Sequence, residues 1–185
     1  MLVVGISGSP RKNGNTDLLL DAALEGSKSE GSAVKKFYLA DSICSGCLGC
    51  GVCSDTGACR ISDSISEIYG CIGRADAVIL ASPLYFENIS SWMKTFVDRG
   101  QFVWSNNLNK NDSKKGLFIS VAARLSADFA CAEKTIRIFF KTLGFQQEKS
   151  LLFPGFEEAG SILDAPFSLD EAREAGRKLV VDRLH

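Results

Sequence analysis

The stretch Ala77-Val-Ile-Leu-Ala81 is apolar at every position and runs directly into the turn Ser82-Pro-Leu84. A short apolar run bounded by turn residues is typical of a strand buried on both faces, as in a parallel sheet covered by helices. Leu117–Ala122 is a second run of this kind. The two runs predict the central strands of a parallel α/β sheet.

Outward from these runs, strands and amphipathic segments alternate along the chain. This alternation predicts an α/β fold in three layers, a doubly wound sandwich with helices on both faces. Five strands favour the order 2-1-3-4-5, with ligands bound beyond the strand carboxyl ends near the switch between strands 1 and 3. The expected strands are Leu2–Ile6, Ala33–Leu39, Ala77–Ala81, Leu117–Ala122 and Lys149–Phe153, and the later helices are Ser64–Arg74, Ile89–Val103, Ala127–Leu143 and Ser168–Leu184.

The chain has 185 residues and a net charge of −1, so we expect a single domain over residues 1–185 and no nucleic-acid partner. Met1-Leu-Val-Val-Gly-Ile6 lacks the basic segment of a targeting signal, and no apolar run is long enough to span a bilayer. We therefore expect a cytoplasmic protein with no membrane partner. Disulfides are rare in that compartment, which disfavours a disulfide framework for the seven cysteines.

The first loop, Ser7-Gly-Ser-Pro-Arg-Lys-Asn-Gly-Asn-Thr16, follows the first strand and precedes a helix. It matches neither G-x-x-x-x-G-K-[ST] nor G-x-G-x-x-G. Its hydroxyl and amide side chains, its glycines and the helix N-terminus are suited to bind one phosphate, and Arg11 and Lys12 add positive charge. The alternative is a hydroxyl-rich turn in which Asn15 or Thr16 only caps the helix.

The third loop, Ser82-Pro-Leu-Tyr-Phe-Glu-Asn88, combines a proline, two aromatic residues and an amide at the end of a strand. Such a loop can form a platform for a flat heteroaromatic ligand, with Asn88 able to donate and accept hydrogen bonds. Alternatively, Tyr85 and Phe86 cover the core and Asn88 caps the next helix. A phosphate loop on the neighbouring strand favours the first interpretation.

Together with Lys94-x-Phe-Val-Asp-Arg99, these two loops resemble the NAD(P)H-dependent FMN reductase family of flavodoxin-like proteins. The resemblance implies a flavodoxin-like FMN-binding domain, an oxidoreductase with NAD(P)H as possible co-substrate, and a homodimer or homotetramer. Many members carry a glycine-rich loop after strand 4, where this chain has Ala122-Ala-Arg-Leu125. The implied FMN-binding residues are Ser7, Ser9, Pro10, Arg11, Asn15 and Thr16 for the phosphate, and Pro83, Leu84, Tyr85, Phe86 and Asn88 for the isoalloxazine ring.

Five cysteines lie between Cys44 and Cys59, in an expected insertion loop at about residues 41–62. The iron–sulfur flavoprotein subgroup of the family carries C-x2-C-x2-C-x5-C at this position. The resemblance implies that the matching residues, Cys47, Cys50, Cys53 and Cys59, are ligands of a [4Fe–4S] cluster. A quartet that starts at Cys44, a zinc site, and a loop of free or redox-active thiols remain alternatives. Cys71 and Cys131 lie in helical patterns and are expected to pack as small apolar side chains.

The expected function is that of an FMN-dependent oxidoreductase that relays electrons between the cluster and FMN. A redox carrier such as ferredoxin, or NAD(P)H, would be the donor, and a quinone or an oxygen species the small-molecule acceptor. The two cofactors would carry this chemistry, so no catalytic side chain is predicted. The alternatives are a cluster-free NAD(P)H-dependent reductase of FMN, quinones or nitro compounds, and a non-enzymatic flavodoxin-like electron carrier or cysteine redox sensor.

Overall fold

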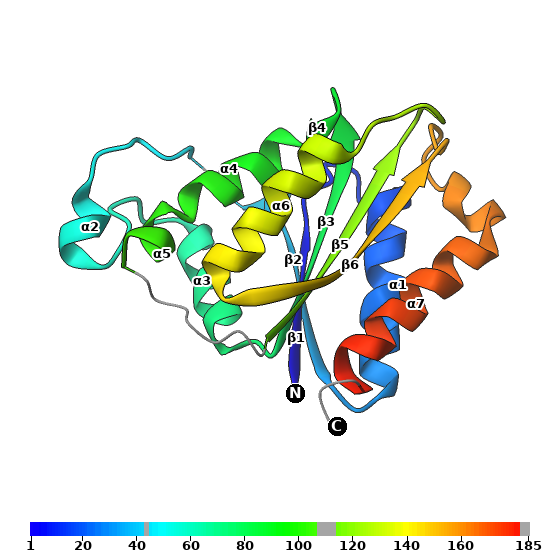
Figure 1. Cartoon of the computed structure of the whole chain (residues 1–185), viewed down its shortest axis with the longest axis horizontal. Coiled ribbons are helices and arrows are strands. Elements are labelled where there is room, and N and C mark those ends of the chain that lie inside the picture. The colour runs from blue at the N-terminus through cyan, green and yellow to red at the C-terminus, as the bar shows by residue number, and fades with distance from the viewer. Residues whose placement is uncertain (43–44, 107–113, 182–185) are drawn as a thin grey trace.

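The computed structural model describes residues 1–42, 45–106 and 114–181. Its sheet has the strand order β2-β1-β3-β5-β6, and all four pairings along this path are parallel (Figure 1). A two-residue strand, β4, pairs antiparallel with the end of β3. Among the parallel strands alone the order is 2-1-3-4-5, which confirms the prediction. The bounds are β1 Leu2–Ser7, β2 Ala33–Tyr38, β3 Ala77–Tyr85, β4 Asn88–Ile89, β5 Lys114–Ala122 and β6 Phe145–Pro154.

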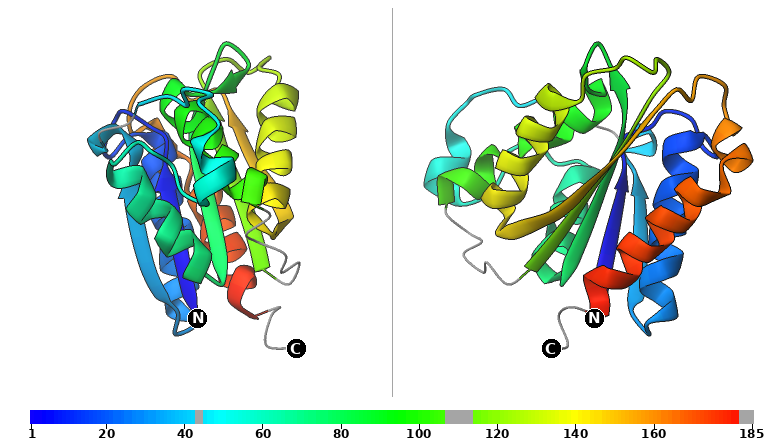
Figure 2. Two further views of the ribbon diagram at one scale, coloured as in Figure 1. Left: turned by 90° about the vertical axis from the view of Figure 1, so that its left-hand side faces the viewer. Right: turned by 45° about the vertical axis from the view of Figure 1, so that its right-hand side comes forward.

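Helices cover both faces of the sheet, so the three-layer sandwich is also confirmed (Figure 2). Helices α1 (Asn15–Ser29) and α7 (Pro166–Val181) lie on one face, whereas α3 (Ser64–Arg74), α4 (Ser91–Arg99) and α6 (Ala130–Leu143) lie on the other. Side chains alternate along β3, so that Ile79 packs on the first side and Leu80 on the second. The sheet therefore separates two hydrophobic cores.

The remaining described elements are short. Helix α5 (Gln101–Asn106) continues from α4, and α2 (Val52–Thr56) lies beside it within the cysteine-rich loop (Figure 1). Two 3-10 turns, η1 (Leu39–Asp41) and η2 (Ser161–Asp164), follow β2 and β6. Within the described parts of the chain, every helix is too short or too polar to cross a membrane.

Several predicted boundaries differ from the structure, most of them by one to four residues. The helix expected over Ile89–Val103 begins at Ser91, because Ser90 accepts a hydrogen bond from the Met93 N–H group and caps it. This helix ends at Arg99 with Gly100 as its C-cap, and a separate helix, α5, begins at Gln101. The last strand begins four residues earlier than predicted, directly after the left-handed Gly144 that ends α6. The predicted end of the closing helix, Leu184, lies outside the described residues.

Candidate functional site

The first loop is fixed to the central strand through Gly8. The Gly8 N–H group donates to the Ala81 carbonyl at 2.8 Å, and the Gly8 carbonyl accepts from Ser90 Oγ at 2.6 Å. A β-carbon on Gly8 would lie 2.9 Å from Met93 Cβ, closer than side chains normally approach. Glycine at this position therefore lets the loop lie directly against the start of α4.

The loop ends at the start of α1, which has no side-chain cap. The N-cap residue, Gly14, has no side chain to satisfy the first N–H groups of the helix. The Thr16 side chain is buried beside them, and Ser7 Oγ is buried without a hydrogen-bond partner among the described residues. A helix N-terminus with unpaired N–H groups and buried hydroxyls suits a phosphate, because an anion satisfies both.

Two of the predicted phosphate ligands also have structural partners. Ser9 Oγ accepts from the Arg11 N–H group at 3.1 Å and shapes the loop from within. Asn15 Nδ2 donates to the Glu158 carbonyl at 2.8 Å, and Asn15 Oδ1 accepts from the Ile162 N–H group at 3.1 Å. Asn15 thus ties the first loop to the segment that follows β6, more than 140 residues further along the chain.

A pocket of about 270 Å³ opens at the carboxyl ends of the strands. Its walls include seven of the predicted FMN-binding residues, namely Ser9, Arg11, Asn15, Thr16, Pro83, Leu84 and Tyr85. Ala123, from the loop after β5, also lines it, as do Phe156 and Glu157, which sequence reasoning missed. Their only sequence signal is the position directly after a parallel strand, at the edge where ligands bind.

Four other predicted residues do not line this pocket. Ser7 is buried at the end of β1, and Pro10 is exposed. Asn88 Oδ1 accepts from the N–H group of Ile89 at 2.9 Å, and the Phe86 side chain is fully exposed. Their part in cofactor binding therefore stays a prediction.

The loop between β3 and β4 is a two-residue turn of Phe86 and Glu87. Both residues have positive φ, of 50° and 58°, in the left-handed region that favours glycine or asparagine. The turn holds the Phe86 ring at the tip of a hairpin, beyond the pocket rim formed by Tyr85.

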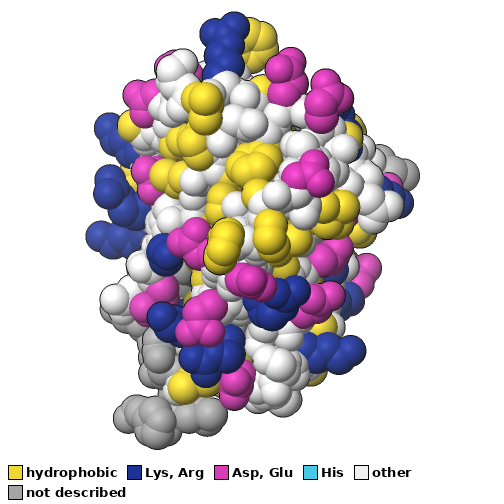
Figure 3. Space-filling model, turned by 90° about the vertical axis from the view of Figure 1, so that its right-hand side faces the viewer, with side chains coloured by type: hydrophobic (Ala, Val, Ile, Leu, Met, Phe, Trp, Pro, Cys, Tyr) yellow, Lys and Arg dark blue, Asp and Glu magenta, His cyan; other side chains and the backbone are white. Residues whose placement is uncertain are grey.

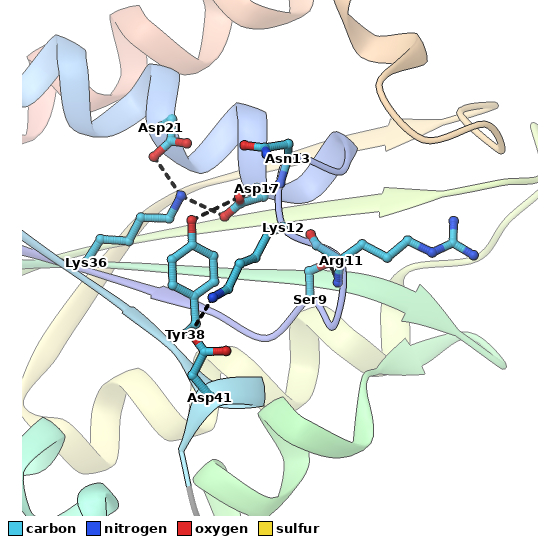
Figure 4. Close-up of polar contacts among 9 residues, drawn as sticks. All are labelled: Ser9, Arg11, Lys12, Asn13, Asp17, Asp21, Lys36, Tyr38 and Asp41. Atoms are coloured by element: carbon cyan, nitrogen blue, oxygen red, sulfur yellow. Dashed lines mark hydrogen bonds and ion pairs between the residues drawn. The ribbon is translucent and has the colours of Figure 1, made fainter.

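The two basic residues of the first loop point in different directions (Figure 4). Lys12 Nζ forms an ion pair with Asp41 at 2.7 Å, whereas Arg11 lines the pocket. Of these two cations, Arg11 is the one available to a bound phosphate.

A buried acid in the first turn of α1, Asp17, supports the loop (Figure 4). Asp17 Oδ2 accepts from the Asn13 N–H group at 2.9 Å and from the Tyr38 hydroxyl at 3.1 Å. Lys36 Nζ lies 2.6 Å from Asp17 Oδ1 and 2.6 Å from Asp21 Oδ1. Burial acts to lower the pKa of Lys36, but hydrogen bonds to Asp17, Asp21 and Tyr38 outweigh it, so the pKa is raised.

The cysteines gather at a second hollow, of about 230 Å³, between the insertion loop and α5. Its lining includes all four predicted ligands, Cys47, Cys50, Cys53 and Cys59, which are free thiols in this structure. Among the described residues, however, no three cysteine, histidine or acidic side chains converge closely enough to hold a metal ion. Four thiols that share one hollow suit a cluster, since four thiolates hold it. In the described part of the structure, however, the four thiols are not drawn together into a binding geometry. Cys44 lies outside the described residues.

Sequence reasoning gave no role at this hollow to Arg99, Phe102 and Trp104, which also line it. Only the fold brings α4 and α5 beside the insertion loop. Cys71 is buried as expected, whereas the prediction for Cys131 was wrong, since this residue is exposed on the outer face of α6.

The strand order defines a flavodoxin-like α/β fold, and a pocket opens at the carboxyl ends of its strands. Residues 1–154 match the family model described as NADPH-dependent FMN reductase, and the chain belongs to this family of flavin-dependent oxidoreductases.

Relatives agree with this assignment, and a solved structure agrees with the fold. An iron–sulfur flavoprotein of Archaeoglobus fulgidus is 44% identical over 54% of this chain, and the match spans 45% of that relative. An iron–sulfur flavoprotein of Methanosarcina thermophila is 34% identical over 74% of this chain and 70% of its own length. A flavone reductase superposes with a TM-score of 0.80 at 19% identity, over 100% of this chain and 63% of the other, which supports the fold alone.

Proposed function

We propose that the chain is an FMN-dependent oxidoreductase that binds the FMN phosphate at the first loop. The observation that carries the proposal is the pocket that opens over the uncapped start of α1. Thr16, Arg11 and the first N–H groups of α1 would hold the phosphate, with Ser7 Oγ as a buried donor beneath. Pro83, Leu84 and Tyr85 would form the wall for the ring.

Bound FMN would supply hydride and single-electron chemistry. The chain's own residues would fix the cofactor and limit the access of water. The described pocket walls carry one cation, one carboxylate, several hydroxyl and amide groups and several apolar groups. The proposed chemistry needs none of them to act as an acid, base or nucleophile. The choice of electron donor and acceptor would therefore depend on which molecules can reach the pocket.

We further propose that Cys47, Cys50, Cys53 and Cys59 hold a [4Fe–4S] cluster that exchanges single electrons with the flavin. The spacing of the thiols, their shared hollow and the names of the relatives support this assignment. Ferredoxin-like carriers or NAD(P)H would be the donors, and a quinone or an oxygen species the acceptor.

The flavin assignment is tested by titrating cofactor-free protein with FMN and with riboflavin. Riboflavin lacks the phosphate, and charge-assisted hydrogen bonds contribute roughly 1.5–3 kcal/mol each. We expect one FMN per chain and riboflavin binding weaker by about 100-fold or more, as two such bonds would give. Equal affinities would refute the phosphate site.

Iron, acid-labile sulfide and zinc assays after anaerobic reconstitution test the cluster. About four irons and four sulfides per chain are expected for one cluster. Flavin without iron would favour the alternative of a cluster-free NAD(P)H-dependent reductase, which the family description also supports. Rapid bleaching of the flavin by NADPH would then be expected. No turnover with any small acceptor would favour an electron carrier.

The proposal includes a cytoplasmic homodimer or homotetramer. Figure 3 views the side that carries α1 and α7, where apolar side chains gather between charged ones. Leu163 in η2 and Phe167 at the start of α7 are exposed large apolar residues of the chain. Exposed apolar patches often mark association surfaces. Sedimentation analysis of the wild type and of L163S/F167S measures the assembly and the contribution of these two side chains.

A further inference from the structure

Arg99, the last residue of α4, is a charged side chain enclosed by the protein. Its side chain is only 1% exposed, and it pairs with Asp63 through two hydrogen bonds, of 2.7 Å and 3.1 Å. Burying a guanidinium is costly unless its charge and its N–H groups are satisfied. Asp63 also caps α3, so the pair joins the ends of two helices.

The other partners of Arg99 are the two ends of the cysteine-rich loop. Nη1 donates to the Ser45 carbonyl at 2.9 Å, two residues before Cys47. Nη2 donates to the Ile61 carbonyl at 3.3 Å, two residues after Cys59. A single planar group thus binds the backbone on both sides of the predicted ligand set and fixes how far apart the two ends lie.

Arg99 also lines the cysteine hollow itself. Its Nε is buried and has no hydrogen-bond partner among the described residues. A guanidinium stays protonated in proteins, so Arg99 brings a permanent positive charge to the hollow that Cys59 also lines. Negative charge accumulates there when thiolates bind a metal centre.

We propose that Arg99 is the positioning residue of the cysteine site. It holds the loop in one arrangement before any metal binds, and it offsets part of the negative charge of the bound centre. The first half of this proposal, the positioning of the loop, concerns the protein alone. The second half, the offset of negative charge, rests on the proposed cluster.

The first half is tested on iron-free protein by hydrogen–deuterium exchange. R99Q removes the charge and the planar group with its paired donors, and R60Q is the matched control because Arg60 lines the same hollow but is exposed. We expect several-fold faster exchange over residues 45–62 in R99Q, with the sheet and R60Q unchanged. Exchange in this loop equal to that of the wild type would overturn the proposal. D63N/R99Q avoids leaving the Asp63 carboxylate unpaired and replaces R99Q if that variant does not fold.

The second half is tested on protein reconstituted anaerobically with iron and sulfide. We expect the R99Q variant to retain several-fold less iron than the wild type and R60Q after desalting, and its remaining cluster to have a more negative midpoint potential. R99K keeps the charge but not the planar group, so we expect it to keep the potential while losing iron. Wild type that binds no iron would refute the proposed cluster and with it this second half, while the exchange data still decide the first. Equal iron content and potential in wild type and R99Q would also overturn the second half.

Discussion

Individual residues at the first loop have different tasks, although the sequence makes them look alike. Of the two neighbouring cations, Arg11 lines the pocket while Lys12 is paired with Asp41. Asn15 is in the pocket wall, yet its amide also secures the segment after β6. Buried support of this kind would keep the proposed phosphate site in its binding geometry before the ligand arrives, which lowers the ordering cost of binding.

We predict that Lys36→Met destabilises the fold by about 2–3 kcal/mol, since it leaves the buried Asp17 carboxylate without its cation. The pKa of Lys36 is raised above 10.5 in the folded state, so the unfolded chain loses this proton first as the pH rises. The stabilisation is therefore complete below about pH 10.5 and declines above it. Urea unfolding of both proteins at pH 7, 9 and 11 measures the difference, which should shrink only at pH 11.

Lys12→Met is the control, because it removes an ion pair of which both partners are more than half exposed. Such pairs contribute at most about 1 kcal/mol. A loss as large as that of Lys36→Met would contradict the distinction between buried support and surface pairing.

At the scale of elements, the turn between β3 and β4 adopts a conformation that its residues do not favour. Phe86 and Glu87 both have positive φ, and such positions cost about 1 kcal/mol for residues other than glycine or asparagine. We predict that F86N/E87G stabilises the protein by about 1 kcal/mol or more, measured as a rise of a few degrees in Tm.

Phe86→Ala is the matched variant, since it removes the exposed ring but keeps a β-carbon at positive φ. We expect its Tm to stay close to that of the wild type. If F86N/E87G instead unfolds at a lower temperature, the side chains of the turn stabilise the fold more than the backbone conformation costs.

Strands that are buried on both faces could be predicted from the sequence, whereas β6, at an edge of the sheet, was predicted only in part. β3 and β5 are apolar over long runs because helices cover both their faces. β6 is an edge strand that pairs with β5 alone, and its first half carries the polar residues Gln146, Gln147 and Glu148. The apolar pattern therefore indicated only its second half. The missed pocket residues, Phe156 and Glu157, depend on the same edge, since contacts from Asn15 hold that segment in place.

At the scale of the whole molecule, α1 and α7 pack so closely that their backbones touch. A β-carbon on Gly26 would overlap the Arg173 carbonyl, and one on Gly176 would overlap the Ala23 carbonyl. Ser27 Oγ donates to the Gly176 carbonyl at 2.9 Å across this contact. Two glycines thus allow the last helix to close one layer of the sandwich.

Gly176→Ala should therefore separate the two helices and destabilise the fold by about 2–3 kcal/mol or more. Gly73→Ala is the control, since a β-carbon on this exposed residue of α3 would meet nothing within 4 Å. It should stabilise the protein by about 0.5–1 kcal/mol through helix propensity. Chemical denaturation of both variants measures the difference, and equal effects would show that helix propensity, not close packing, decides at Gly176.

The hydrogen bond from Asn15 to the segment after β6 holds a wall of the pocket that is synthesised late in the chain. The residues that line the cysteine hollow have all been synthesised once residue 105 has been added to the chain. The cofactor pocket still lacks a wall at that moment, because Phe156 and Glu157 are translated later. A nascent chain therefore contains the whole lining of the cysteine hollow before it contains the whole lining of the proposed flavin pocket.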